Sequence, residues 1–205
     1  SPKTTILNSN IKYINEFIPS YSMGERTRSY LKVQDGCDYN CSFCTIPLAR
    51  GFSRSNSIEK TIKIAKKILK NNIKEIVLTG VNVGDFGKER GESLFELIVE
   101  LEKLKNIERI RFSSIEPNLL INKIIDFCAN SKKLMPHFHI PLQSGSDKIL
   151  GLMKRRYNLS LYSKRINRIK KEMPDSCIGV DVMVGFPGET KSDFLDTYTY
   201  LNELP

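Results

Sequence analysis

The sequence predicts an α/β fold in which about five strand–helix units form a partial (β/α) barrel. Short β-branched runs alternate with helical apolar periodicity from Ser29 to the end of the chain. Such units in series imply parallel strands joined by right-handed crossovers. A cysteine-rich loop, residues 36–44, directly follows the first predicted strand. Because barrel sites are built from loops at the carboxyl ends of the strands, this position favours a barrel over an open sheet.

The expected elements follow from these periodicities. Each β-branched run is short and bounded by turn-forming residues, whereas the helical segments repeat apolar residues every three or four positions. We expect strands at residues 30–33, 75–79, 109–114, 137–142 and 178–184. We expect helices at residues 57–71, 94–101, 120–128, 147–153, 159–171 and 194–201.

One domain is expected over residues 26–205, because the chain is long enough to bury a sizeable core. Residues 1–25 carry polar and turn-forming residues with one brief apolar patch, and we interpret them as a linker or arm. The sequence ends after a fifth strand–helix unit without a further strand. We therefore expect a piece of a longer protein that stops before the last barrel strand.

The net charge of +9 permits a nucleic-acid partner without requiring one. Lys60, Lys63, Lys67 and Lys70 form one helical stripe, which we interpret as a solvated outer face opposite an apolar stripe. No apolar run is long enough to cross a bilayer, and the first residues lack a signal-peptide pattern. Clustered rather than paired cysteines favour reduced thiols and a cytoplasmic location.

Cys37, Cys41 and Cys44 have the spacing C-x₃-C-x₂-C on one short loop. Three thiolates can hold three irons of a [4Fe–4S] cube and leave the fourth iron open to a small chelating cofactor. The alternative is a structural zinc ion, which needs four nitrogen or sulfur ligands. Cys128 and Cys177 are isolated in apolar helix and strand patterns, where a free cysteine behaves as a small buried hydrophobe. The spacing therefore favours the open cluster.

Polar or glycine-rich residues follow the other predicted strands. The Gly-rich loop at residues 79–87 either lets a ligand approach the backbone or is simply a flexible turn. Ser114 and Glu116 could hold ribose hydroxyls, Gln143 is a further candidate ligand residue, and Gly185 suits a tight turn beneath a planar base. His137 and His139 share one strand face, and we interpret both as satisfied core residues. The basic residues 154–156 could neutralise a phosphate or carboxylate.

Four stretches together resemble the methylthiotransferase branch of the radical S-adenosylmethionine (SAM) superfamily. They are residues 32–37 (KVQDGC), 46–51 (IPLARG), 141–146 (PLQSGS) and 184–189 (VGFPGE), and the likeness covers nearly all of residues 26–205. The loops 79–87 (TGVNVGDFG) and 113–117 (SSIEP) are most similar to the MtaB group, which modifies threonylcarbamoyladenosine beside the tRNA anticodon. Related groups act on isopentenyladenosine in tRNA or on an aspartate of a ribosomal protein, and both remain alternatives.

The resemblance implies a radical SAM partial (β/α) barrel whose cluster cleaves SAM to a deoxyadenosyl radical. It implies iron ligation by Cys37, Cys41 and Cys44, and a one-electron reductant such as flavodoxin or ferredoxin. The SAM-binding residues that it implies, lying across the carboxyl ends of the strands, are Phe43, Thr79, Gly80, Ser114, Glu116, Gln143, Arg155 and Gly185.

Full-length members of this family carry a second [4Fe–4S] cluster on an amino-terminal domain and an RNA-binding TRAM domain at the other end. These 205 residues contain no second cysteine triad. We therefore expect tRNA to bind mostly through domains that are absent here. An alternative hypothesis, that the chain is a zinc-holding RNA-binding module and not an enzyme, also stays open at this point.

Overall fold

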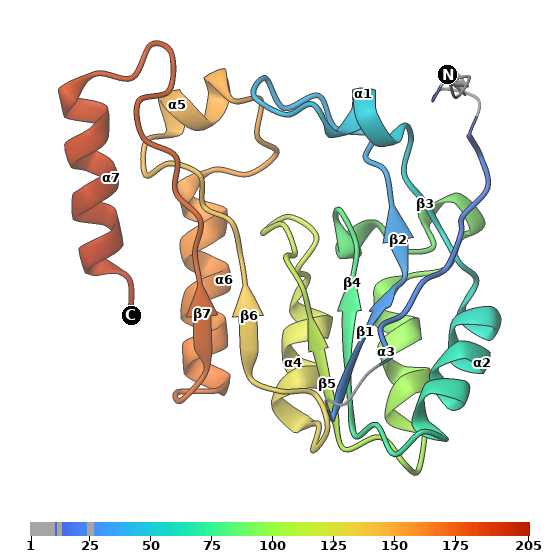
Figure 1. Ribbon diagram of the computed structural model, residues 1–205. Coiled ribbons are helices and arrows are strands. Elements are labelled where there is room, and N and C mark those ends of the chain that lie inside the picture. The colour runs from blue at the N-terminus through green and yellow to red at the C-terminus, as the bar shows by residue number, and fades with distance from the viewer. Residues whose placement is uncertain (1–10, 12–13, 24–26) are drawn as a thin grey trace, which may run out of the picture.

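The computed structural model describes residues 11, 14–23 and 27–205. A row of parallel strands runs through the molecule, with helices packed behind it in the view of Figure 1. The strands of the row are β1 (Arg28–Lys32), β4 (Glu75–Thr79), β5 (Arg109–Phe112), β6 (His137–His139) and β7 (Cys177–Gly179). The main helices are α2 (Ile58–Leu69), α3 (Leu94–Glu102), α4 (Asn122–Asn130), α5 (Asp147–Leu152), α6 (Leu159–Glu172) and α7 (Lys191–Glu203).

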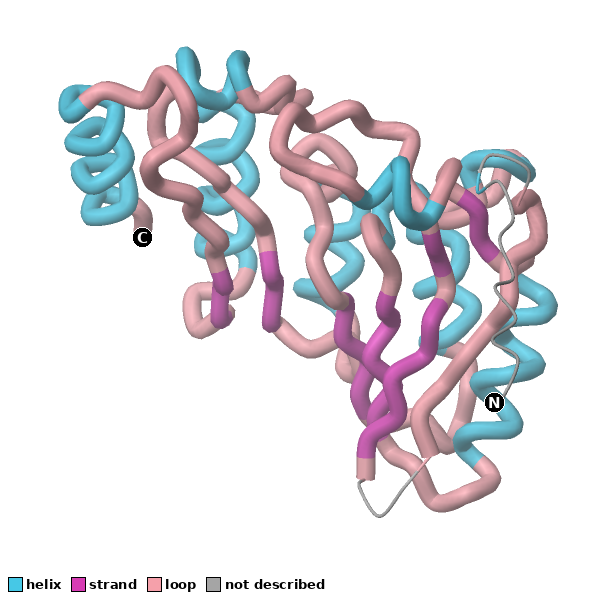
Figure 2. Tube along the Cα trace, turned by 45° about the horizontal axis from the view of Figure 1, so that its top comes forward, coloured by secondary structure: helices cyan, strands magenta, loops and turns pink. Residues whose placement is uncertain are grey.

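The strands pair in parallel in the order of the chain. A three-stranded sheet has the order β1-β4-β5, and β6 pairs with β7. Figure 2 shows these as two groups of strands, and a parallel bridge between Ile110 and Leu134 links them. A second bridge, Gln143 to Val182, continues the β6–β7 pairing beyond the named strands. The predicted α/β fold of parallel strand–helix units is therefore confirmed.

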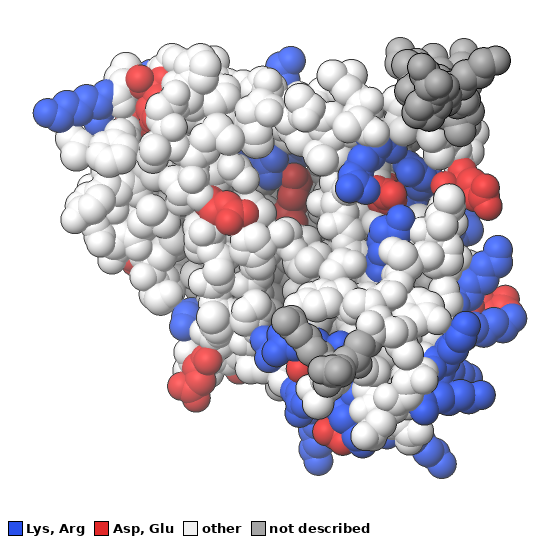
Figure 3. All heavy atoms as spheres, in the orientation of Figure 1, with Lys and Arg blue, Asp and Glu red and all other residues white. Residues whose placement is uncertain are grey.

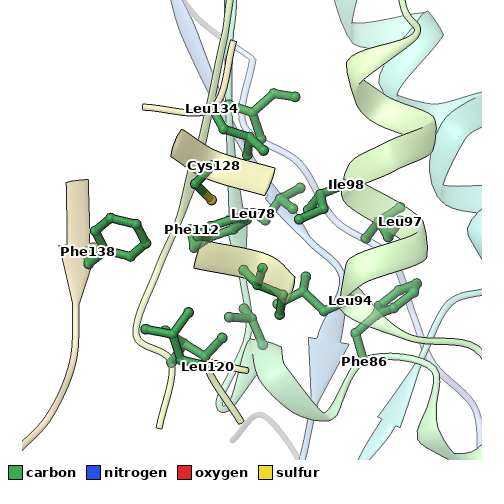
Figure 4. Packing of buried hydrophobic residues seen from close by; sticks show 14 of the residues in the cluster. Leu78, Phe86, Leu94, Leu97, Ile98, Phe112, Leu120, Cys128, Leu134 and Phe138 are labelled. Carbon is green, nitrogen blue, oxygen red and sulfur yellow. The ribbon is translucent and has the colours of Figure 1, made fainter. Parts of the chain in front are cut away.

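The core lies between the strands and the helices behind them. Ile76 and Leu78 of β4 are fully buried and belong to the same cluster as Leu97 and Ile98 of α3 (Figure 4). Complete burial of such a side chain contributes about 1.5–3 kcal/mol. Alternation along β4 places Glu75 on the other face of the sheet, which is polar.

Three predicted strands are longer than the observed ones, because each strand ends before its apolar run does. β5 ends at Phe112, β6 at His139 and β7 at Gly179, after which each segment continues without ladder pairing. Five short elements were not expected, because they are too short for any periodicity. They are β2 (Gln34–Asp35), α1 (Ile46–Arg50), β3 (Arg54–Ser55) and the 3₁₀ turns η2 (Val83–Asp85) and η3 (Lys88–Arg90).

The described part of the predicted arm runs antiparallel to β1. The Ser22 amide donates to the Tyr30 carbonyl over 3.0 Å, and the Lys32 amide donates to the Ser20 carbonyl over 2.9 Å. Most of the arm's other residues, 1–10, 12–13 and 24–25, lie outside the described residues. Within the described ranges, no helix is long and apolar enough to cross a membrane.

Helix α7 is attached to the loop that follows β6. The Gly145 amide donates to Thr197 Oγ1 over 2.9 Å, and Ser146 Oγ donates to Asp193 Oδ1 over 2.9 Å. Thr190 and Asp193 form a capping box at the start of the helix. A Cβ atom on Gly145 would lie 2.5 Å from the Thr197 Cα atom, so the absence of a side chain at this position lets the helix pack closely.

We predict that Gly145→Ala destabilises the protein by about 1–3 kcal/mol, because the added methyl group must push the α7 backbone away. Gly151→Ala in α5 is the matched control, since its Cβ would meet nothing within 4 Å. Alanine is the better helix former, so this control should stabilise by about 0.5–1 kcal/mol. Urea unfolding followed by circular dichroism measures both, and equal midpoints for the two variants would contradict the packing argument.

The two isolated cysteines differ in exposure, which corrects one expectation. Cys128 is buried in the helical layer as expected, but Cys177 is exposed because β7 forms the edge of the described strand row. Burial raises the pKa of the Cys128 thiol to about 12.

We predict that iodoacetamide at about pH 8 modifies Cys177 in the folded chain and spares Cys128, because only a thiolate at an accessible position reacts. Peptide mass spectrometry before and after unfolding in urea distinguishes the two sites. Cys128 should become reactive only in urea. Rapid labelling of Cys128 in the folded chain would show that the α4 layer opens readily.

Candidate functional site

Three thiols meet at one pocket above the carboxyl ends of the strands. The cysteine loop lies between β2 and α1, and the Cys37 amide donates to the Gly51 carbonyl over 3.0 Å. Gly36 at the start of this loop has φ +71°, and a Cβ there would lie 2.0 Å from the Phe52 carbonyl oxygen. Glycine is therefore required at the point where the loop leaves β2.

The pocket has a volume of about 210 Å³ and gathers most of the residues singled out in the sequence. Its predicted members are Cys37, Cys41, Phe43, Cys44, Ser114, Glu116, Gln143 and Arg155. Its other members, which sequence reasoning did not select, are Tyr39, Ile46, Val81, Asn82 and Pro141. We call this space the thiol pocket.

The remaining predicted residues lie elsewhere. Thr79 and Gly80 line a neighbouring pocket of about 460 Å³. A Cβ on Gly80 would lie 2.8 Å from Gln34 Oε1, so this glycine permits close packing of β4 against β2. Gly185 forms a turn with φ +74°, and its amide donates to the Glu189 carboxylate. Direct contacts of Thr79, Gly80 and Gly185 with SAM stay a prediction.

Arg155 is the buried cation of the thiol pocket, with a side chain only 6% exposed. Its guanidinium lies 2.8 Å from Glu116 Oε1 through Nη2 and 3.1 Å from Cys41 Sγ through Nη1. Its Nε donates to the Tyr157 hydroxyl over 3.2 Å. Burial raises the pKa of the Glu116 carboxyl above its usual range, although Arg155 and Arg156 oppose that rise. Arg155 thus contacts both the Glu116 carboxylate and the Cys41 sulfur.

A buried hydrogen-bond network fixes the cysteine loop against β4. The Gln34 amide group donates to the Gly36 carbonyl over 2.7 Å, and its Oε1 accepts from the Asn82 backbone amide over 2.8 Å. Asn82 Nδ2 and the Tyr39 hydroxyl both donate to the Asp85 carboxylate, over 3.1 and 2.8 Å. Burial raises the pKa of Asp85 above its ordinary value. Such a connected buried network holds the loop in one geometry.

Gln143 has an unusual backbone for a residue that is not glycine, with φ +69°. Its amide donates to the Asp181 carbonyl over 2.8 Å, and its own carbonyl accepts from the Met183 amide over 2.9 Å. The surrounding pairing therefore imposes the left-handed conformation, which costs about 1–2 kcal/mol for such a residue. Strain of this kind tends to occur at ligand sites.

His139 connects two strand ends rather than filling the core. Its Nδ1 lies 2.5 Å from Ser114 Oγ, and its Nε2 lies 3.1 Å from Asp181 Oδ2. Its hydrogen bonds are therefore satisfied as expected, but the ring is part-exposed on the polar face rather than buried. His137 differs, because its buried Nδ1 has no hydrogen-bond partner among the described residues.

The three cysteines supply the donor set that an open cluster needs. Cys37, Cys41 and Cys44 line one pocket. A [4Fe–4S] cube spreads its thiolate ligands over different irons, so it needs thiols around a space rather than around a point. The donor set therefore fits the cube.

Curated relatives match most of the chain. The chain is 40% identical over 188 residues to the threonylcarbamoyladenosine tRNA methylthiotransferase MtaB of Bacillus subtilis, a match that covers 91% of the chain and 41% of that protein. It is 42% identical to the MtaB of Aquifex aeolicus, over 88% of the chain and 44% of that protein. A tRNA-2-methylthio-N(6)-dimethylallyladenosine synthase from Ruegeria is 38% identical, over 86% of the chain and 41% of that protein. The chain spans about two fifths of the length of these relatives.

Solved structures share the fold at low sequence identity. The radical SAM methyltransferase TsrM from Kitasatospora setae superposes with a TM-score of 0.68 and 14% identity, covering 84% of this chain and 34% of that one. A radical SAM methyltransferase from Sphaerobacter thermophilus gives a TM-score of 0.56 and 15% identity, covering 89% of this chain and 55% of that one. The family model for the radical SAM superfamily matches residues 31–201. The chain therefore belongs to the radical SAM superfamily, whose members use a [4Fe–4S] cluster and SAM.

Proposed function

We propose that this chain is the SAM-cleaving core of a methylthiotransferase that adds a methylthio group to the adenine of threonylcarbamoyladenosine in tRNA. One observation carries the proposal: the thiol pocket brings Cys37, Cys41 and Cys44 together with Glu116 and Arg155 at the carboxyl ends of parallel strands. This is where barrel enzymes carry their reactive groups.

The three cysteines would hold three irons of a [4Fe–4S] cluster. With SAM bound, that group supplies a one-electron cleavage that yields a deoxyadenosyl radical. The protein's part is to bind, orient and shield, because the reactive chemistry belongs to the cofactor. Phe43 would pack near the adenine of SAM, and Gln143 offers a side-chain amide at the same pocket.

Arg155 and Glu116 suit the charged end of SAM. Both lie in the thiol pocket, and their ion pair leaves each side chain almost enclosed, at 6% and 14% exposure. A SAM carboxylate would accept from the Arg155 guanidinium by a charge-assisted hydrogen bond. Ser114 and Glu116 offer acceptors for ribose hydroxyls from the neighbouring strand end.

The proposed substrate rests on similarity to the relatives. Two MtaB proteins at 40% and 42% identity act, by their names, on threonylcarbamoyladenosine. The dimethylallyladenosine synthases at 34–38% identity support the coarser class, which is an adenosine of tRNA carrying an N6 substituent. The loops at residues 79–87 and 113–117, which resemble the MtaB group, favour the threonylcarbamoyl form.

Further partners follow from the same proposal. The sulfur would come from a second [4Fe–4S] cluster on another part of the full-length protein, and tRNA would bind mainly through that protein's other domains. The electron would come from a cytoplasmic carrier such as flavodoxin or ferredoxin. The positive charge in Figure 3 gathers on the side of α2, where blue side chains are dense, and suits a polyanionic partner.

We predict that Cys41→Ala lowers the iron content of the anaerobically reconstituted chain to near zero, from about four irons per chain, because two thiolates do not hold an open cube. Cys177→Ser is the matched control, since this exposed thiol lies away from the pocket. Cys128→Ala should also keep its iron. Iron retention in Cys41→Ala, or a colourless wild-type protein that binds one zinc ion, would contradict the proposal.

We predict that the 205 residues, reconstituted and reduced with dithionite, cleave SAM slowly to 5′-deoxyadenosine but form no methylthio product. These residues include only one cysteine triad, so they hold no sulfur-donating second cluster. Chromatography with mass spectrometry of the nucleosides measures both products.

The substrate is tested by grafting. The matching 188 residues of Bacillus subtilis MtaB are replaced by this chain's, in a strain that lacks the original enzyme. We expect methylthio-threonylcarbamoyladenosine in the tRNA of this strain, and none with Cys41→Ala in the graft. A graft that cleaves SAM but modifies only dimethylallyladenosine would replace the proposed substrate with the alternative one.

A further inference from the structure

A second pocket of about 460 Å³ adjoins the thiol pocket. Ile46 of α1 and Val81 after β4 line both spaces, so the two pockets share a wall. The second pocket is also lined by Lys32 at the end of β1, by Asp35 of β2 and by Arg50 at the end of α1. Nothing in the proposed SAM site uses these three charged residues.

Three cations surround one carboxylate beside this pocket. Asp35 lies 3.3 Å from Lys32 Nζ, 3.2 Å from Arg50 Nη1 and 3.4 Å from Arg54 Nη2. Burial alone would raise the pKa of Asp35, but the Gly36 amide and the Lys32 and Arg54 cations together hold it below its ordinary value. The carboxylate is therefore ionised, and the group carries an excess of two positive charges. Blue and red atoms gather beside β2 in Figure 3.

Arg54 and Arg50 differ in how many of their hydrogen-bond donors are already used. Arg54 is 13% exposed and donates to three backbone carbonyls, those of Glu16, Arg50 and Phe52, besides its ion pair. It is a structural cation that fastens the chain around β3. Arg50 is 53% exposed and makes a single hydrogen bond among the described residues, to Asp35. Within the described part of the chain, its Nε and Nη2 atoms have no acceptor and can serve as donors at the pocket.

We propose that the Lys32–Arg50 pocket binds an anionic group of the substrate nucleotide while the adenine lies toward the thiol pocket. The inference rests on the proposed function. It names one recognition chemistry, a carboxylate or phosphate oxygen held by Arg50 and Lys32 through charge-assisted hydrogen bonds. The group has two possible sources: the carboxylate of the threonylcarbamoyl substituent or a phosphate of the nucleotide.

The position and the charge both support this use. The shared wall of Ile46 and Val81 puts the cations next to the reactive pocket but not inside it. Asp35 holds the guanidinium of Arg50 on one side, so less side-chain entropy is lost when an anion binds on the other. The group also has three cations on one carboxylate, which leaves positive charge available to an anion.

The test measures equilibrium binding of four small probes to the reconstituted, SAM-loaded chain. The probes are threonylcarbamoyladenosine, the same nucleoside with its carboxylate converted to an amide, adenosine 5′-monophosphate and adenosine. The first pair isolates the carboxylate and the second pair isolates the phosphate. We expect the anionic member of at least one pair to bind about tenfold more tightly than its neutral partner.

Variants assign that preference to the pocket. Arg50→Gln should remove about tenfold of the anion's affinity and leave the neutral probe unchanged, and Lys32→Met should act in the same direction. Arg50→Lys should retain part of the affinity, because the charge stays but the forked geometry is lost. Arg168→Gln on α6 is the matched control, since Arg168 is 37% exposed and pairs with a single aspartate far from the site. Circular dichroism confirms that each variant is folded.

The outcomes separate the two proposals. If Arg50→Gln weakens the binding of threonylcarbamoyladenosine alone, the bound anion is the carboxylate. If it weakens the binding of adenosine 5′-monophosphate alone, the bound anion is the phosphate. Equal binding of both members in both pairs, or equal weakening of anionic and neutral probes by Arg50→Gln, overturns the anion pocket. The graft experiment fails or succeeds independently, so an active graft without anion discrimination rejects this inference alone.

Discussion

Side chains alternate between the two faces of each strand, and this alternation separates an apolar face packed on the helices from a polar face. Ile76 and Leu78 of β4 face the helices and are fully buried, so the period of two sends Glu75 to the opposite face. There Glu75 lies 3.2 Å from Arg109 and 2.9 Å from Arg111. A buried carboxylate is tolerated only with such partners. The polar face is therefore a consequence of the helical packing, and the site loops arise above it.

The Gln34 side chain ties the cysteine loop to two other segments of the chain. Gln34 donates to the Gly36 carbonyl and to Ser53 Oγ, and accepts from the Asn82 amide. It thereby joins the loop, the segment before β3 and the loop after β4. Gly80 leaves just enough room for this amide to pack. These contacts anchor the loop whose three thiols line one pocket.

The sequence was most informative where a signal is local. The spacing of the three cysteines and the alternation of strands and helices both involve neighbours in the chain, and both led to the fold and the thiol pocket. The partners of Arg155 were not foreseeable, because Cys41 and Glu116 are 114 and 39 residues away. The same holds for Asn82, whose amide contacts a residue 48 positions earlier. Cys177 was wrongly expected to be buried, because an apolar run does not indicate whether its strand lies at an edge.

The two neighbouring pockets differ in the charge they can accept. In the thiol pocket, Arg155 already contacts Glu116 and Cys41, and in the proposed function its remaining donors bind the SAM carboxylate. In the second pocket Asp35 leaves an excess of positive charge at Arg50. An anionic substituent placed in the thiol pocket as a second anion, beside the SAM carboxylate and the thiolates of the proposed cluster, would be repelled, and the repulsion grows as water is excluded. Cations beyond the Ile46–Val81 wall would instead draw that substituent away from the sulfurs and so orient the adenine toward them.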